Sequence, residues 1–156
     1  MKKIILIPIA ILFLANCSDS GLNLNVSEIE QDFSHIEDPR ERWEAYQLED
    51  YYIEQTWVCE CQPPSGADTY ILQGKILQYI FHEDPSSGRD KEYRATKIMT
   101  VDEAFDLIES YQGNAYSVEI KYHPRFGYPT EINIDIMENV ADEEIHHNFR
   151  NLKRIN

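Results

Sequence analysis

Every second residue between Tyr51 and Cys61 belongs to a set rich in apolar side chains, and most of the residues between them are polar. Successive side chains of a strand point to opposite faces, so this period of two predicts a long strand with one buried face. A second alternation, from Tyr116 to Tyr122, predicts another half-buried strand. Strands with one face in water are typical of antiparallel sheets.

Turn residues separate further β-prone runs. Gln73 and Gly74 stand between the runs at 69–72 and 75–81 and predict a tight hairpin, because glycine accepts a positive φ. The sequence Pro-Pro-Ser-Gly at 63–66 predicts a turn that ends the first long strand.

Capping residues predict two helices. Asp38 before Pro39 begins a helix expected over 39–49, and Thr100 begins a second, each with a glutamate three residues after the capping residue. Between the hairpin and the second helix, residues 82–97 have no period and contain Pro, Gly, Ser and mixed charges. That stretch is expected to be a mobile excursion.

The C-terminal segment allows two readings. Residues 132–136 alternate Ile with Asn and Asp and predict a strand, whereas in the tail at 142–152 the apolar residues fit either helical or strand spacing. Taken together, the order of elements predicts an α+β fold. We expect a mostly antiparallel sheet of about five or six strands with two helices packed on one face.

The first 17 residues, MKKIILIPIAILFLANC, predict a secretory signal. The apolar run is shorter than the about 20 residues of a membrane-spanning helix. Residues 14–17 resemble a bacterial lipobox, in which the cysteine receives lipid, so we expect cleavage of residues 1–16 and lipidation of Cys17. We further expect a polar tether over 17–36 and one α+β domain over 37–156. Docking of Leu22, Leu24, Val26 and Ile29 on the domain remains an alternative.

Charge excludes one class of partner. The formal net charge of -14 leaves no basic stripe for a phosphate backbone, so we expect no nucleic acid partner. Cleavage after residue 16 removes Lys2 and Lys3 and no acid, which lowers the charge to -16. We therefore expect a lipid-anchored domain in the cell envelope that stands off an anionic membrane and faces the periplasm or the exterior.

The order of these signals resembles a family of small bacterial lipoproteins known as domain of unknown function 6174. The resemblance rests on Trp43, on the strand that ends in Cys-Glu-Cys at 59–61, on the helix sequence at 100–108 and on Phe126-Gly127-Tyr128-Pro129 with its following strand. It implies a cell-envelope lipoprotein and a closing strand after Asp142, and it carries no established activity.

Cys59 and Cys61 are the clearest chemical feature, because an oxidising compartment and the loss of Cys17 to lipid leave them as a pair. The α-carbons of residues two apart on a strand are about 6.5 to 7 Å apart, so a bridge requires a bend. The sequence leaves four readings open: a structural disulfide, free or intermolecular thiols, metal ligands, and a redox centre.

Other motifs predict no chemistry. Adjacent His146 and His147 point to opposite faces of a strand and are expected to be exposed, and the acidic residues at 135–144 lack calcium-loop spacing. No nucleophile elbow, phosphate loop, zinc-protease or dinucleotide motif occurs in the chain, so we expect no cofactor and no metal.

Tyr122 and the turn that follows it, with Arg125, Phe126 and Tyr128, form a candidate partner surface. Our leading hypothesis is therefore a lipid-anchored binding or structural module that contacts an envelope protein or a cell-wall component. The alternative is a thiol-disulfide or metal-assisted enzyme centred on Cys59 and Cys61, and of the two we favour the non-enzymatic one.

Overall fold

The structure, a computed structural model, describes residues 24–59, 62–83, 85–86, 88–140 and 143–156. The side chains of residues 59 and 62–64 are not among those described. The described residues form the elements β1 (Val26–Ser27), α1 (Pro39–Ala45), β2 (Tyr51–Cys59), β3 (Gln62–Leu72), β4 (Lys75–Phe81), α2 (Gly88–Ala95), α3 (Val101–Tyr111), β5 (Ser117–Tyr122), β6 (Pro129–Asp135) and β7 (Ile145–Ile155).

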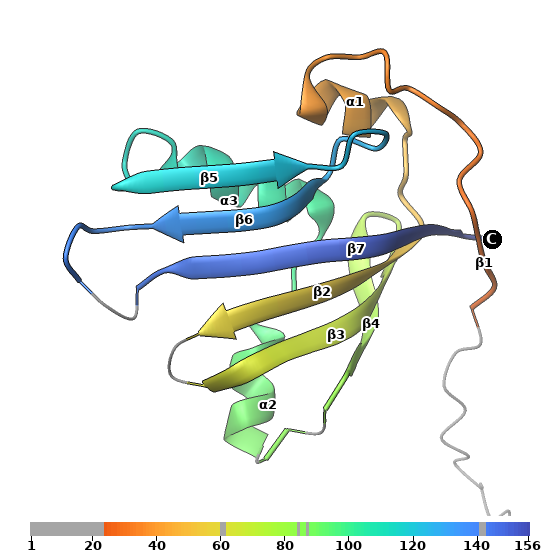
Figure 1. The fold of residues 1–156 in the computed structure, drawn as a ribbon. Coiled ribbons are helices and arrows are strands. Elements are labelled where there is room, and N and C mark those ends of the chain that lie inside the picture. The colour runs from red at the N-terminus through yellow and green to blue at the C-terminus, as the bar shows by residue number, and fades with distance from the viewer. Residues whose placement is uncertain (1–23, 60–61, 84, 87, 141–142) are drawn as a thin grey trace, which may run out of the picture.

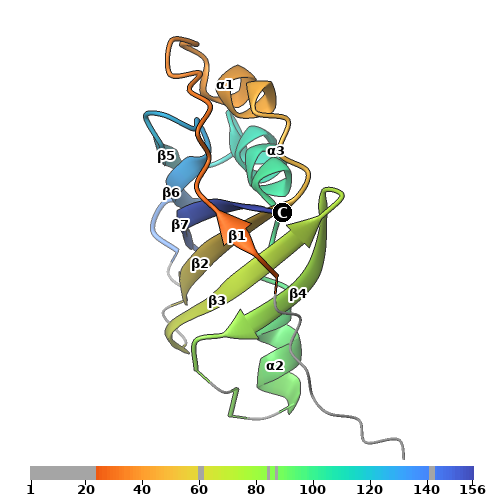
Figure 2. The ribbon, with the colours of Figure 1, turned by 90° about the vertical axis from the view of Figure 1, so that its right-hand side faces the viewer.

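The strands make one antiparallel sheet in the order β4-β3-β2-β7-β6-β5, with β1 paired to the end of β7 (Figure 1). The last strand in sequence, β7, lies between β2 and β6 and joins the two halves of the sheet. All three helices of the described residues lie on one side of the sheet (Figure 2). We call the opposite side the outer face. The α+β class is confirmed, but the sheet has seven strands and not five or six, and a third helix is present.

Local hydrogen bonds fix both of the helices that the sequence predicted. The carboxylate of Asp38 accepts from the backbone N–H of Glu41 at 2.8 Å, and α1 ends at Ala45, four residues earlier than expected. At α3 the capping box is complete: Glu103 N donates to Thr100 Oγ1 at 3.1 Å, and Thr100 N donates to Glu103 Oε2 at 2.7 Å. Each satisfied N–H removes one of the unpaired donors at a helix start.

The core fills the space between the sheet and the helices. Trp43 of α1, Tyr51 of β2 and Phe105 of α3 are all buried there, and the hydroxyl of Tyr51 accepts from Val101 N at 3.0 Å. The Trp43 indole N–H donates to Asp102 at 2.9 Å. Trp43 and Tyr51 therefore bury their rings in the core and place their polar atoms in hydrogen bonds with α3. These contacts tie α3 to α1 and β2.

Two segments differ from their sequence-based predictions. The predicted turn at 63–66 lies within β3, where Ser65 and Gly66 pair with Trp57 and Thr56. The predicted excursion at 82–97 contains the polar helix α2, in which Arg94 and Asp90 form a mostly buried ion pair at 2.9 Å.

The segment at 24–36, predicted from its polar sequence to belong to the tether, packs on the domain. Val26 pairs with Ile155, and Ile29 is only 3% exposed. Apolar residues spaced along this segment are covered by the domain, in line with the docking alternative. Cys17 and Leu22 lie outside the described residues.

Candidate functional site

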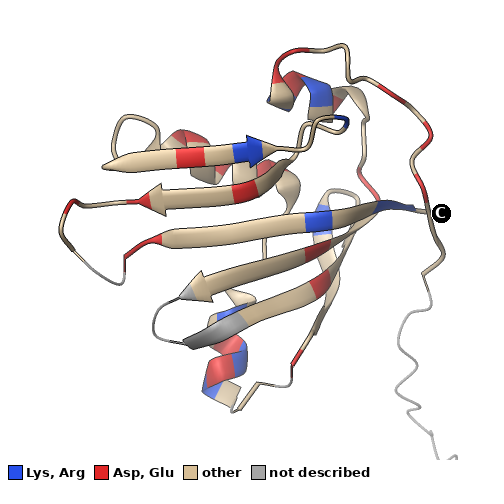
Figure 3. Cartoon of the chain, in the orientation of Figure 1, with Lys and Arg blue, Asp and Glu red and all other residues tan. Residues whose placement is uncertain are grey.

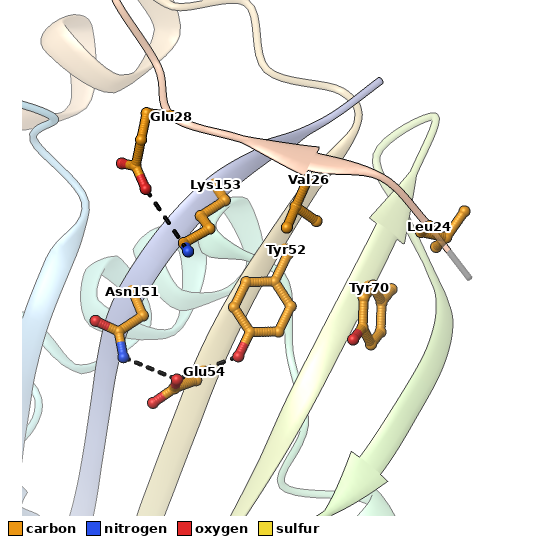
Figure 4. Close-up of a pocket in the computed structure, with 8 residues that line it drawn as sticks. All are labelled: Leu24, Val26, Glu28, Tyr52, Glu54, Tyr70, Asn151 and Lys153. Carbon is orange, nitrogen blue, oxygen red and sulfur yellow. Dashed lines mark hydrogen bonds and ion pairs between the residues drawn. The ribbon is translucent and has the colours of Figure 1, made fainter. Parts of the chain in front are cut away.

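An open cavity of about 510 Å³ lies on the outer face of the sheet (Figure 4). Its floor consists of side chains from β2, β3 and β7, and the N-terminal segment forms one wall with Leu24, Val26 and Glu28. Figure 4 shows Tyr52 and Tyr70 side by side on the floor, with ring centroids 5.3 Å apart. We call this the outer-face cavity.

Glu54 is the centre of the polar network in the outer-face cavity. Its carboxylate accepts from Arg150 Nε at 2.7 Å, from Asn151 Nδ2 at 2.8 Å and from the Tyr52 hydroxyl at 3.2 Å. Partial burial raises the pKa of Glu54, but the hydrogen bonds from Asn151, Arg150 and Tyr52 outweigh it and hold that pKa below its ordinary value. The carboxylate is therefore ionised and well paired.

A β-bulge in β7 makes this network possible. Tyr52 and Glu54 pair with Lys153 and Arg150, so two residues of β7 stand opposite Ile53 alone. The extra residue, Asn151, has a φ of 56°. A bulge of this kind redirects a side chain, and here it brings Asn151 to the same face as Arg150.

The network continues across the sheet, where one basic and two acidic positions lie side by side on β7, β2 and β3 (Figure 3): Arg150, Glu54 and Asp68. The Tyr52 hydroxyl also lies 2.9 Å from Asp68, which is 3.1 Å from His82 Nε2. Burial and the adjacent carboxylates of Asp68 and Glu54 raise the pKa of Tyr52 far above its ordinary value, so this hydroxyl stays protonated. The carboxylates of Glu54 and Asp68 already have hydrogen-bond donors within the protein. This favours a structural role for the network over the binding of a ligand.

A second cavity, of about 380 Å³, lies on the helix side of the sheet. Its walls come from the ends of β2 and β7, from α2 with the residues that follow it, from α3, from Ile136 and from residues 143–145. They are largely apolar or aromatic: Trp57, Tyr93, Met99, Leu107, Ile136 and Ile145. Lys97, Glu143, Glu144 and His147 add polar groups to the lining. We call this the helix-face cavity, and it has the composition expected of a small-molecule site.

His147 is held in one state at the base of the helix-face cavity. Its ring is 2% exposed and stacks on Trp57, with centroids 5.9 Å apart. Its Nε2 lies 3.1 Å from Oε1 of Gln55, which also accepts from Met99 N at 3.2 Å. An amide oxygen accepts only, so Nε2 carries the proton. Burial and the nearby charge of Lys97 lower the pKa of His147 to about 3, and the ring is neutral at pH 7.

Gln55 is fully buried and completes this arrangement. Its Nε2 donates to Thr69 Oγ1 at 3.0 Å and to the Met99 carbonyl at 2.8 Å. The side chain thus joins β2, β3, β7 and the segment before α3 at one point. The sequence pattern predicts an exposed His147. The structure shows that it is buried, because it has a partner on β2 that the sequence alone does not reveal.

Two charged groups on the wall of the helix-face cavity have no ionic partner among the described residues. Glu143 accepts from Met137 N at 2.6 Å through Oε1, while its Oε2 is buried without a hydrogen bond. The ammonium of Lys97 lies 5.1 Å from the centroid of the Tyr93 ring. Within the described part of the chain, neither group forms an ion pair with any residue inside 4.0 Å, so neither charge is neutralised by a neighbouring side chain.

The turn at 122–128, expected as a partner surface, is used within the protein. Tyr128 is 3% exposed, and Tyr122 and Phe126 pack against the core. The guanidinium of Arg125 donates through Nη2 to the carbonyls of Ile29, Glu30 and Gln31 at 2.8 to 3.0 Å. The structure thus brings these residues together: the three aromatic rings pack on the core and Arg125 holds the N-terminal segment. A partner surface at this turn remains a prediction.

We expect Arg125→Met to release that segment, because it removes the donors to three carbonyl groups. Hydrogen exchange over residues 24–33 should rise, and the free energy of unfolding should fall by about 2 kcal/mol. Arg154→Met is the matched control, since the contact of Arg154 with Gln31 is long, at 3.4 Å, and exposed. Unchanged exchange in Arg125→Met would show that Arg125 does not hold the segment.

The cysteines fall largely outside what the structure describes. Cys17 and Cys61 are outside the described residues, and Cys59 is described only as the last backbone position of β2, opposite Gln62. The bridge between Cys59 and Cys61 remains a prediction. Among the residues that the structure describes, no three His, Cys, Asp or Glu side chains come together to hold a metal ion. No described helix has both the length and the apolar character needed to cross a membrane.

The fold and its cavities define a small α+β protein built on one antiparallel sheet, with its helices on one side. The profile of one family matches residues 35–154, from four residues before α1 to the next-to-last residue of β7. The chain belongs to this family, which is described as a family of unknown function (DUF6174). The resemblance is thereby confirmed at the level of the family. No curated protein and no solved structure matches the chain.

Proposed function

We propose that the protein is a lipid-anchored binding module of the bacterial cell envelope, and that the helix-face cavity is its ligand site. The observation that carries the binding role is this cavity, whose apolar walls hold Lys97 and Glu143 without ionic partners among the described residues. The anchor is supported by the apolar run and the lipobox that ends at Cys17.

The position of the N-terminal segment supports an orientation of the anchored protein in which the outer face of the sheet lies toward the membrane. Leu24 lies at the outer-face cavity, over the floor formed by Tyr70 and Tyr52 (Figure 4). Seven residue steps separate Cys17 from Leu24, and at about 3.4 Å per step they span no more than about 24 Å. A lipid on Cys17 would therefore keep the outer face close to the membrane, with the helix-face cavity on the other side of the sheet.

The arrangement around His147 favours binding over catalysis. A general base needs a pKa near the working pH, whereas the pKa of His147 is lowered to about 3 and its Nε2 is bonded to Gln55. The ring serves as a flat wall beside Trp57. Proton transfer at neutral pH does not suit this histidine.

Cell fractionation tests the anchor. We expect wild-type protein in the detergent-soluble membrane fraction and Cys17→Ala in the soluble fraction, because the thioether lipid would be lost. Cys59→Ala is the matched control, which removes a thiol and leaves the lipobox intact. Incorporation of labelled fatty acid into wild type and Cys59→Ala alone gives the second readout. A Cys17→Ala protein that keeps its label and its membrane position would refute the anchor.

A further inference from the structure

We propose that the helix-face cavity binds a small zwitterion, namely an apolar amino acid or short peptide with a free ammonium and a free carboxylate. This inference rests on the proposed binding function and names the ligand class. It follows from three features of the same wall: a carboxylate that needs a donor, an ammonium that needs an acceptor, and an apolar surface between strands and helices.

The acidic part of the site is Glu143, with Glu144 beside it in the lining. One oxygen of Glu143 is occupied by the backbone N–H of Met137, which fixes the side chain against the strand end. The other oxygen is buried and has no donor. A buried acceptor without a partner is unfavourable, so a rotation of the carboxylate that turns this oxygen toward the cavity and a ligand N–H group would be favoured.

The basic part of the site is Lys97. Its ammonium lies over the ring of Tyr93, and the neighbouring imidazole of His147 is neutral. No carboxylate of the described residues is within ion-pair distance of Lys97, although Glu143 and Glu144 line the same cavity. The opposite charges are therefore held apart and not neutralised by each other. A ligand carboxylate can approach Lys97 while a ligand ammonium approaches Glu143.

The rest of the wall selects an apolar body. Trp57, Met99, Leu107 and Ile145 surround a space of about 380 Å³, at the lower end of the range for small-ligand pockets. A purely anionic ligand would approach Glu143 and Glu144, and a purely cationic one would approach Lys97, so each would gain one contact and suffer one repulsion. A zwitterion avoids both repulsions.

Four leucine dipeptides test this inference on the full chain purified in detergent. Leucyl-leucine is a zwitterion, leucyl-leucinamide is a cation, N-acetyl-leucyl-leucine is an anion, and N-acetyl-leucyl-leucinamide is neutral. We expect calorimetry to show that the zwitterion binds about tenfold more tightly than the cation or the anion, the equivalent of one charge-assisted hydrogen bond. The indole N–H signal of Trp57 should shift on binding, which locates the ligand.

Variants assign each charge. Glu143→Gln should weaken the zwitterion and the cation about tenfold and leave the anion unweakened, while Lys97→Met should weaken the zwitterion and the anion but not the cation. Glu28→Gln and Lys153→Met, which remove the ion pair at the outer-face cavity, are the matched controls and should change nothing.

The outcomes separate the two proposals. If all four dipeptides bind equally and shift the Trp57 signal, the helix-face cavity is a binding site but the preference for a zwitterion is wrong. If none of them binds or shifts that signal, the zwitterion is excluded and the assignment of this cavity as the ligand site falls with it. The anchor is then judged by fractionation alone.

Discussion

Gly127→Ala is expected to lower the free energy of unfolding by about 4 kcal/mol, a loss at the upper end for single substitutions. Gly127 has a φ of +82°, which costs a residue with a side chain about 1 to 2 kcal/mol. A Cβ atom at this position would also lie 2.2 Å from the carbonyl oxygen of Pro39 and 3.0 Å from Trp43 N. Both atoms belong to the backbone of α1, so the overlap is relieved only by moving the helix.

Gly113→Ala separates the two contributions. Gly113 also has a positive φ, of +78°, but nothing lies within 4 Å of a Cβ built there. We expect this control to lose only the backbone cost of about 1 to 2 kcal/mol in urea unfolding. The difference between the two losses of unfolding free energy then measures how much the close packing of the turn at 122–128 on α1 contributes. Equal losses would mean that the close approach of Gly127 to α1 does not contribute to stability.

The alternation of side chains predicted the sheet well, because it depends only on which residues meet the core. From Tyr51 to Trp57 every odd-numbered residue is buried, as expected. The sequence of the tail at 142–152 fits both a helix and a strand, and the structure shows the physical reason. The bulge at Asn151 sets Phe149 and Leu152 three residues apart on the buried face, a spacing that also fits a helix. Only the pairing of β7 with β2 and β6 distinguishes a strand from a helix in this segment.

The helix α2 could not be predicted from an apolar stripe, because it has none. Its residues are mainly charged, and its only buried side chain is that of Arg94. Asp90 accepts from Arg94 one turn later and also from the N–H of Ser86 at 2.8 Å before the helix begins. Spacing alone gives such pairs little weight, since charged pairs four residues apart stabilise a helix only weakly.

The helix-face cavity was equally hidden from the sequence. His147, which lines it, and Gln55, which holds His147 from below, are 92 positions apart and meet only through the pairing of β2 with β7. One signal was present: Gln55 stands between Ile53 and Trp57 on the apolar face of its strand. A polar side chain at an inward position must find partners when it is buried, and this one joins four segments of the chain.

Acid is expected to destabilise the protein through His147. In the unfolded chain the pKa of this histidine has its ordinary value of 6.5, and in the folded protein burial lowers it to about 3. Between these two pH values the unfolded state binds the proton and the folded state does not. The contribution of His147 to stability is therefore intact above pH 6.5 and is lost as the pH falls from 6.5 toward 3. From pH 8 to pH 5 the loss amounts to about 2 kcal/mol.

Comparison with His147→Gln isolates this effect, because an amide keeps a donor for Gln55 Oε1 and does not titrate. Burial and the charge of Arg125 also lower the pKa of His123, which acts in the same direction but remains in both proteins. We therefore expect urea unfolding at pH 8, 6.5 and 5 to show a smaller loss of stability in His147→Gln than in the wild type. Between pH 8 and pH 5 the two losses should differ by about 2 kcal/mol. Equal pH dependence in the two proteins would mean that His147 takes up its proton in the folded state, and a charged ring beside Lys97 would then have to be neutralised by Glu143 or Glu144.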